Sequence, residues 1–156
     1  AGATVEARRH RWSVVTGSHG CTWLHVLGSR RERVRGGHRL AVVGPLRLSA
    51  GRPVIARFIE SIFSPGMWTR VHAHPGPEAF YVVEGIQCME TPSERRRVPA
   101  GSTYIVEGPH VQAAPAGRRN IAVVFHAPGE PWMQIGSAWQ PSEFCFDQAE
   151  PSPSPS

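Results

Sequence analysis

Apolar and polar residues alternate in short runs along most of this chain, and no long segment has the period of a helix. Alternation favours strands, because successive side chains of a strand point to opposite faces. The predicted strands cover residues 42–49, 53–63, 67–74, 78–83, 86–91, 95–98, 103–106, 110–114 and 120–126. Glycines and prolines lie between them, where tight turns are needed. The pattern predicts an all-β single domain, a jelly roll or small barrel.

The predicted strand 53–63 carries apolar residues on both of its faces. Phe58 and Ile62 share one face, and Ile55 and Ile59 share the other. One face can pack inside the barrel, and the other then needs a second chain or the N-terminal arm to cover it. On this ground we expect a homodimer.

Length and charge bound the organisation further. The 156 residues suffice for one domain with a substantial core. No apolar run is long enough to cross a bilayer, so we expect no membrane partner. All basic residues are arginine, and eight arginines against two glutamates lie in residues 1–41. A basic arm can bind nucleic acid or an anionic surface, but this composition favours a partly disordered extension, and we expect no nucleic-acid partner.

The remaining boundaries follow from composition. Residues 42–127 are predicted to form the barrel. Residues 128–150 form a C-terminal segment packed on it, where aromatic side chains cover the open edge or, alternatively, stack on sugar rings. Residues 151–156 alternate proline and serine and are predicted to be a disordered tail. The chain begins with Ala1, which is explained by processing or truncation, for example by removal of a signal peptide.

Candidate chemistry concentrates in residues 66–85. His72 and His74 lie two positions apart, so in a strand they project to the same side. A Pro-Gly-Pro turn follows, and Glu78 opens the next predicted strand. This geometry can place two nitrogens and one oxygen around a single metal ion.

The segment resembles the first motif of the cupin superfamily, in which a glycine, His-x-His, a glutamate and a second glycine follow at fixed spacing. Every fixed position matches: Gly66, His72, His74, Glu78 and Gly85. Residues 99–110 resemble the second motif and contribute His110, although the loop before it is about two residues short and Ala114 stands where asparagine is common.

The resemblance covers about residues 53–127 and implies a cupin-type jelly-roll barrel, the double-stranded β-helix. It also implies one metal ion bound by His72, His74, Glu78 and His110. A carboxylate that only hydrogen-bonds near the ion would leave the same sequence, so a direct bond from Glu78 remains open. Imidazole ligands suit iron, copper, nickel and zinc, and a carboxylate also admits manganese. Copper and iron are favoured, and about two coordination positions would stay open for reaction.

Strand alternation nominates the neighbours of these ligands. Arg70 shares the side of His72, Phe80 that of Glu78, and Gln112 that of His110, so these are the pocket candidates. Gln112 can orient a bound water or substrate oxygen, unless it is a surface amide. Arg70 can hold an anionic substrate group, but pairing with a nearby acid is the preferred interpretation.

The resemblance implies three classes of function. We favour a mononuclear copper or iron oxidoreductase that uses dioxygen or peroxide on a carbohydrate or other organic substrate. The second class is a non-redox metallocupin, such as a sugar isomerase, epimerase, decarboxylase or lyase. The third is a non-catalytic module that binds a metal or small ligand. Copper fits a secreted or periplasmic protein, and iron fits the cytoplasmic alternative.

The chain has three cysteines, and none forms a CxxC pair that would suggest a structural zinc site. Small cupins that this chain resembles often carry one cysteine just after the first motif and another near the C-terminus. Cys88 and Cys145 match those places, so the resemblance implies a disulfide between them, with two buried thiols as the alternative. Cys21 is left over.

Overall fold

The computed structural model describes residues 12–29, 35–48 and 51–146, which fall into two compact units divided after Val42. In the first unit, β1 (Ser13–Ser18) and β2 (Cys21–Val26) form an antiparallel hairpin. The indole nitrogen of Trp23 donates a hydrogen bond to the Ser18 hydroxyl at 3.1 Å. Sequence analysis predicted only an extension here and missed the hairpin. Residues 1–11 and the predicted tail 151–156 lie outside the described residues.

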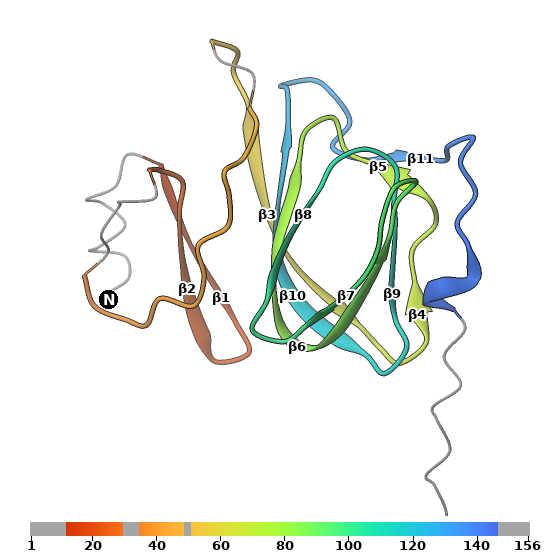
Figure 1. Ribbon diagram of the computed structural model, residues 1–156. Coiled ribbons are helices and arrows are strands. Elements are labelled where there is room, and N and C mark those ends of the chain that lie inside the picture. Colours follow the sequence, from red (N-terminus) through yellow and green to blue (C-terminus); the bar gives the residue numbers. More distant parts are fainter. Residues whose placement is uncertain (1–11, 30–34, 49–50, 147–156) are drawn as a thin grey trace, which may run out of the picture. The chain divides into compact units, whose positions relative to one another are not determined.

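The second unit is built almost entirely of antiparallel strands that curl around a common interior (Figure 1). Its elements are β3 (Ile55–Phe63), β4 (Met67–Trp68), β5 (His72–Ala73), β6 (Glu78–Glu90), β7 (Arg95–Pro99), β8 (Thr103–Val106), β9 (Val111–Ala114), β10 (Arg118–His126), β11 (Gln134–Ile135) and the 3-10 turn η1 (Glu143–Cys145). The main sheet runs β3-β10-β6-β9-β4, and β7 and β8 also pair with β6. Strand β11 pairs with β5.

Strand β6 organises the barrel because it changes partners at Gly85. Its first half pairs with β10 and β8, and its second half pairs with β7 and β9. Two strands separated by a turn at this glycine were predicted, and the structure has one bent strand of 13 residues instead. Gly85 has a φ of 73°, and a Cβ there would lie 2.2 Å from the carbonyl oxygen of Gly117. The glycine therefore permits a bend and a close crossing.

Two other strand predictions need correction. The predicted strand 42–49 is wrong, since residues 42–48 are irregular in the structure. Pro45 lies in their middle and has no N–H to contribute to a ladder. The predicted strand 67–74 is divided into β4 and β5.

Strand β3 lies at the edge of the sheet and pairs with β10. Ile55 and Ile62 stay 40% and 52% exposed on it. An apolar, partly exposed edge is consistent with the expected homodimer, which stays a prediction.

The interior of the barrel is filled by a cluster of buried side chains from β6, β7, β8 and β10. The cluster consists of Phe80, Val82, Met89, Val98, Val106 and Ala122. Phe80 and Val82 alternate along β6, as expected where one face of a sheet forms the core. The prediction of an all-β fold, a cupin-type double-stranded β-helix, is confirmed. Among the described residues, no helix has the length and apolar character needed to cross a membrane.

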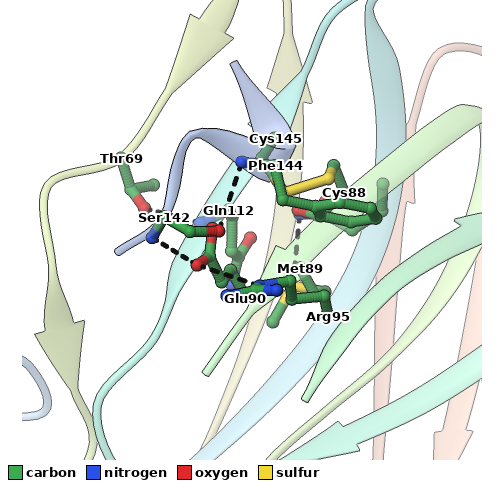
Figure 2. Close-up of a disulfide and its surroundings, with 10 residues drawn as sticks. Thr69, Cys88, Met89, Glu90, Arg95, Gln112, Ser142, Phe144 and Cys145 are labelled. Atoms are coloured by element: carbon green, nitrogen blue, oxygen red, sulfur yellow. Dashed lines mark hydrogen bonds and ion pairs between the residues drawn. A yellow bond between two sulfur atoms is a disulfide. The ribbon is translucent and has the colours of Figure 1, made fainter. Parts of the chain in front are cut away.

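The C-terminal segment is fastened to the outside of the barrel (Figure 2). Cys145 of η1 forms a disulfide with Cys88 of β6, the pair that the cupin resemblance implied. The backbone N–H of Ser142 donates to the buried carboxylate of Glu90 beside it. Phe144 packs against the small buried cluster around the disulfide. The segment therefore contacts the barrel at Ser142, Phe144 and Cys145.

Candidate metal centre

Two segments far apart in sequence bring the candidate ligands together. His72 belongs to β5, and His110 immediately precedes β9. Their backbones form a two-way bridge, from His72 N to His110 O at 3.1 Å and from His110 N to His72 O at 2.9 Å. This antiparallel bridge fixes the second-motif histidine directly opposite the first-motif pair.

The turn between His74 and Glu78 returns the chain into the barrel. Gly76 sits in it so close to β10 that a Cβ would lie 2.6 Å from the carbonyl oxygen of Phe125. The Phe125 N–H in turn donates to the carbonyl oxygen of Pro77 at 3.3 Å. The turn is thereby held against β10, and Glu78 enters β6 pointing into the barrel.

The four side chains converge on one point. One ligand atom from each of His72, His74, Glu78 and His110 lies within 4.8 Å of all the others. Oε2 of Glu78 is 3.1 Å from Nε2 of His110 and 3.4 Å from Nε2 of His74. His72, Glu78 and His110 are 4%, 5% and 1% exposed. Such a buried concentration of donors is a potential metal site.

The three imidazoles are oriented in the same way. Nδ1 of His72 lies 2.9 Å from the carbonyl oxygen of Arg70, Nδ1 of His74 2.7 Å from that of Trp132, and Nδ1 of His110 2.9 Å from that of Gly108. A carbonyl oxygen can only accept, so each Nδ1 must carry the proton. In a neutral ring, Nε2 then offers its lone pair. Metal-binding histidines are oriented in this manner by their outer partners.

The electrostatics of the cluster favour a neutral His72 and an ionised Glu78. Burial and the neighbouring His110 lower the pKa of His72 to about 4, so this ring is neutral at pH 7. Burial alone would raise the pKa of Glu78, but the adjacent His110 and His74 hold that pKa well below its ordinary value. Burial also opposes the charge on His74, yet its hydrogen bonds to Glu78 and to the Trp132 carbonyl raise its pKa. Glu78 is therefore an anion at neutral pH.

The donor set fits a divalent transition-metal ion. Three imidazole nitrogens and one carboxylate oxygen suit iron, copper, nickel, zinc or manganese. With its proton on Nδ1, the buried Nε2 of His110 is an acceptor that faces another acceptor, Oε2 of Glu78, at 3.1 Å, and no hydrogen bond to it is formed among the described residues. A buried nitrogen of this kind requires a partner, and a metal ion would supply one.

The three pocket candidates lie in different surroundings in the structure. Gln112 is buried beside the cluster, and its Nε2 donates to Oε2 of Glu78 at 2.9 Å. Phe80 shares the inward face of Glu78 but belongs to the hydrophobic core. Arg70 is exposed, and its backbone carbonyl, not its guanidinium, contacts the centre. The prediction that the Arg70 side chain points into the pocket is wrong. Residues 69–71 are irregular between β4 and β5, so strand alternation does not apply to them.

Three residues near the centre were not assigned to it from the sequence. Besides its carbonyl, Trp132 places its ring parallel to that of His74, with centroids 5.7 Å apart. The guanidinium carbon of Arg57 lies over the Trp132 ring, 5.4 Å from its centroid. Arg118 of β10 is buried and donates to Oε1 of Gln112 at 3.1 Å. The aromatic composition of the C-terminal segment was a signal for Trp132, but no local pattern marked Arg57 or Arg118.

The chain is similar to several solved structures. No protein-family model and no curated protein matches the chain. Among solved structures, an RmlC-like cupin from Shewanella frigidimarina is 25% identical over 47% of this chain and 68% of its own, with a TM-score of 0.43. A Klebsiella pneumoniae protein with a double-stranded β-helix domain is 21% identical over 58% of this chain and 84% of its own, with a TM-score of 0.44.

Enzymes are also found among the similar structures. A salicylate 1,2-dioxygenase from Pseudaminobacter salicylatoxidans is 17% identical over 51% of this chain but only 27% of its own, with a TM-score of 0.41. An oxalate oxidase and DMSP lyases are further examples. Because every quoted TM-score is below 0.5, the fold assignment rests on the strand pairing and the motif described above.

Proposed function

We propose that this cupin-type barrel binds one transition-metal ion through His72, His74, Glu78 and His110, and that the protein is a metal-dependent oxidoreductase using dioxygen or peroxide on an organic substrate. The observation that carries the proposal is the common orientation of the three imidazoles. Each Nδ1 is bonded to a backbone carbonyl, which leaves three Nε2 atoms for an ion beside an ionised Glu78.

The chain's own residues would hold the ion and shield it. A redox-active ion in this site would supply one-electron chemistry at coordination positions that the protein leaves open. His72, Glu78 and His110 are buried and the His74 side chain is only 4% exposed, which keeps water from the ligand side of the centre. The parallel ring of Trp132 covers His74. Histidine and glutamate are therefore fixed before any ion or substrate arrives.

The disulfide supports a choice of compartment and of ion. Disulfides such as Cys88–Cys145 persist mainly in oxidising surroundings. We therefore propose a secreted or periplasmic protein. Copper is the proposed ion there, because it binds nitrogen and oxygen ligands most tightly among the divalent first-row metals. Iron is the alternative for a protein of the cytoplasm.

Metal analysis tests this proposal directly. Protein purified without chelators would be measured for metal content and by electron paramagnetic resonance. We expect one copper or iron ion per chain, with a signal that shows nitrogen ligands. One zinc ion per chain without a redox-active metal would instead favour the non-redox class, and a protein that takes up no metal would overturn the assignment of the centre.

Substitution of two buried histidines, one inside the cluster and one outside it, tests the ligand set. His110 and His126 are both buried, but His126 of β10 lies outside the cluster. We expect His110→Gln to weaken copper binding by more than the roughly 10–100-fold that removal of an outer partner costs. His126→Gln should retain stoichiometric binding in the same titration. Equal affinity of the two variants would argue against His110 as a ligand.

A further inference from the structure

A buried arginine lies beneath the candidate centre. Arg118 is only 4% exposed, and its guanidinium packs 3.6 Å from the centroid of the Phe63 ring. Nη1 donates to both the carbonyl and the hydroxyl oxygen of Ser61, each at 2.7 Å. Nη2 donates to Oε1 of Gln112 at 3.1 Å. The charge is thus held rigidly between β3, β9 and β10.

Arg118 and Glu78, which lie on either side of Gln112, fix the orientation of its side-chain amide. A guanidinium can only donate, so the end of Gln112 that faces Arg118 must be the carbonyl oxygen. The amino end of Gln112 then faces Glu78 and donates to Oε2 at 2.9 Å. An ionised carboxylate can only accept, which agrees with this orientation at the other end. Both groups flanking the amide therefore exclude the flipped orientation.

The oxygen of Glu78 that accepts from Gln112, Oε2, is also the one that faces the histidines. Oε2 of Glu78 accepts from Gln112 and also lies 3.1 Å from Nε2 of His110. A buried carboxylate that moves between rotamers would be a poor ligand, and hydrogen bonds from outer residues are the usual means of fixing one. The electrostatic attraction of the buried Arg118 charge to Glu78 adds to this effect.

From these contacts we infer that Arg118 and Gln112 are positioning residues that fix Glu78 as a ligand of the metal ion. The inference rests on the proposed function, because it presupposes an ion in the centre. Among the described residues Arg118 forms no hydrogen bond to a candidate ligand, so it acts on Glu78 through the Gln112 amide and through its charge. A purely structural role of Arg118, as a crosslink between β3 and β10, would change the stability of the barrel but not the properties of the ion.

Two nearly isosteric substitutions of Gln112 separate these roles. Gln112→Glu can still accept from Arg118, but it cannot donate to Glu78 and sets a second carboxylate beside it. Gln112→Met removes both hydrogen bonds. We expect both variants to bind Cu²⁺ about 10–100-fold more weakly than the wild type in calorimetric titrations. We also expect the copper resonance spectrum of each variant to change, because the position of an oxygen ligand changes.

The neighbouring arginines of β10 provide the matched control. Arg119 pairs with Glu60 and Glu84 rather than with Gln112. Arg118→Lys keeps the charge but cannot span Ser61 and Gln112 in the same way. We expect Arg118→Lys to weaken Cu²⁺ binding and alter the spectrum, and Arg119→Lys to leave both as in the wild type. Thermal unfolding would be recorded for every variant to confirm that it is folded.

The outcomes distinguish the two proposals. If the wild type binds Cu²⁺ and the folded variants Gln112→Glu and Arg118→Lys bind it with unchanged affinity and spectrum, the positioning inference is overturned and the proposed function stands. If the wild type takes up no transition metal at all, both fall. A loss of stability without a change in affinity or spectrum would assign Arg118 a structural role and likewise overturn the inference.

Discussion

Single residues of this barrel combine a backbone task with a chemical one. Each histidine of the centre uses Nδ1 to bind a carbonyl of its own scaffold and leaves Nε2 for chemistry. The glycines divide in a similar way. Gly85 and Gly101 both have a positive φ, but a Cβ on Gly101 would meet nothing within 4 Å, whereas one on Gly85 would meet the backbone of Gly117.

This contrast gives a prediction for two alanine substitutions. Gly101→Ala should cost only the strain of the left-handed conformation, about 1–2 kcal/mol of the free energy of unfolding. Gly85→Ala carries the same strain and, in addition, forces β6 and β10 apart, which should cost about 1–3 kcal/mol more. Urea unfolding of both variants measures the difference. Equal destabilisation would show that β6 does not cross β10 as closely as described.

Residue by residue, strand alternation predicted the centre where the backbone is regular and failed where it is not. Gln112 was found because it follows His110 by two positions, and β9 begins directly after His110. Arg70 precedes His72 by the same spacing, but the intervening backbone is irregular, so the rule does not apply. Arg118 lies on another strand and reaches Gln112 only through the folding of β10 against β6, which no local pattern encodes.

At the scale of the elements, the short strands and turns at the rim are held by side chains rather than by the sheet. Thr91 and Glu94 close the connection between β6 and β7, with the Thr91 hydroxyl accepting from the Glu94 N–H at 2.9 Å. The Tyr104 hydroxyl of β8 donates to Oε2 of Glu94 at 2.7 Å. Burial and this bond raise the pKa of Tyr104 to about 12.

The raised pKa predicts how this rim responds to alkali. Its folded value lies above the ordinary value of 10.0, so the protonated phenol stabilises the fold. That stabilisation should be complete below about pH 10 and should be lost as the pH rises towards 12. Ultraviolet titration of phenolate absorbance should show a late ionisation step. The step should be missing in Tyr104→Phe, and if it remains there, it does not belong to Tyr104.

Several strands of the barrel, short ones as well as long ones, were predicted closely. Strands β3, β8 and β10 lie within two residues of the predicted segments. The hairpin β1–β2 was missed because charge and composition outweighed the short alternating run in residues 13–26. Conversely, the apolar residues of 42–48 suggested a strand that Pro45 does not permit.

At the scale of the whole molecule, the second unit is closed by its C-terminal segment. Strand β11 pairs with β5 beside the candidate centre, and the disulfide fastens η1 to β6. The segment between these two attachments therefore spans from the metal ligands to the outer face of the barrel. Residues 57 positions apart are joined by the bridge, and closing so long a loop restricts the unfolded chain strongly.

Loss of this bridge should therefore lower stability more than loss of the third cysteine. In the chain-entropy account, removing a bridge over a loop of this length costs about 4 kcal/mol of unfolding free energy. We expect the double variant Cys88→Ser and Cys145→Ser to show a decrease of this order in denaturant unfolding. Cys21 is free and exposed, so Cys21→Ser should unfold like the wild type.

A dithiol reductant tests the contribution of the Cys88–Cys145 bond without a change of sequence. Reduction should bring wild-type protein, and the Cys21→Ser variant, close to the stability of the double variant, which should itself not respond to the reductant. The comparison separates the restriction of the unfolded chain from the packing of the serine side chains, since reduced wild type retains both sulfur atoms in the cluster with Ala113 and Phe144. If reduced and oxidised wild type unfold at the same denaturant concentration, the bridge does not close the barrel in solution.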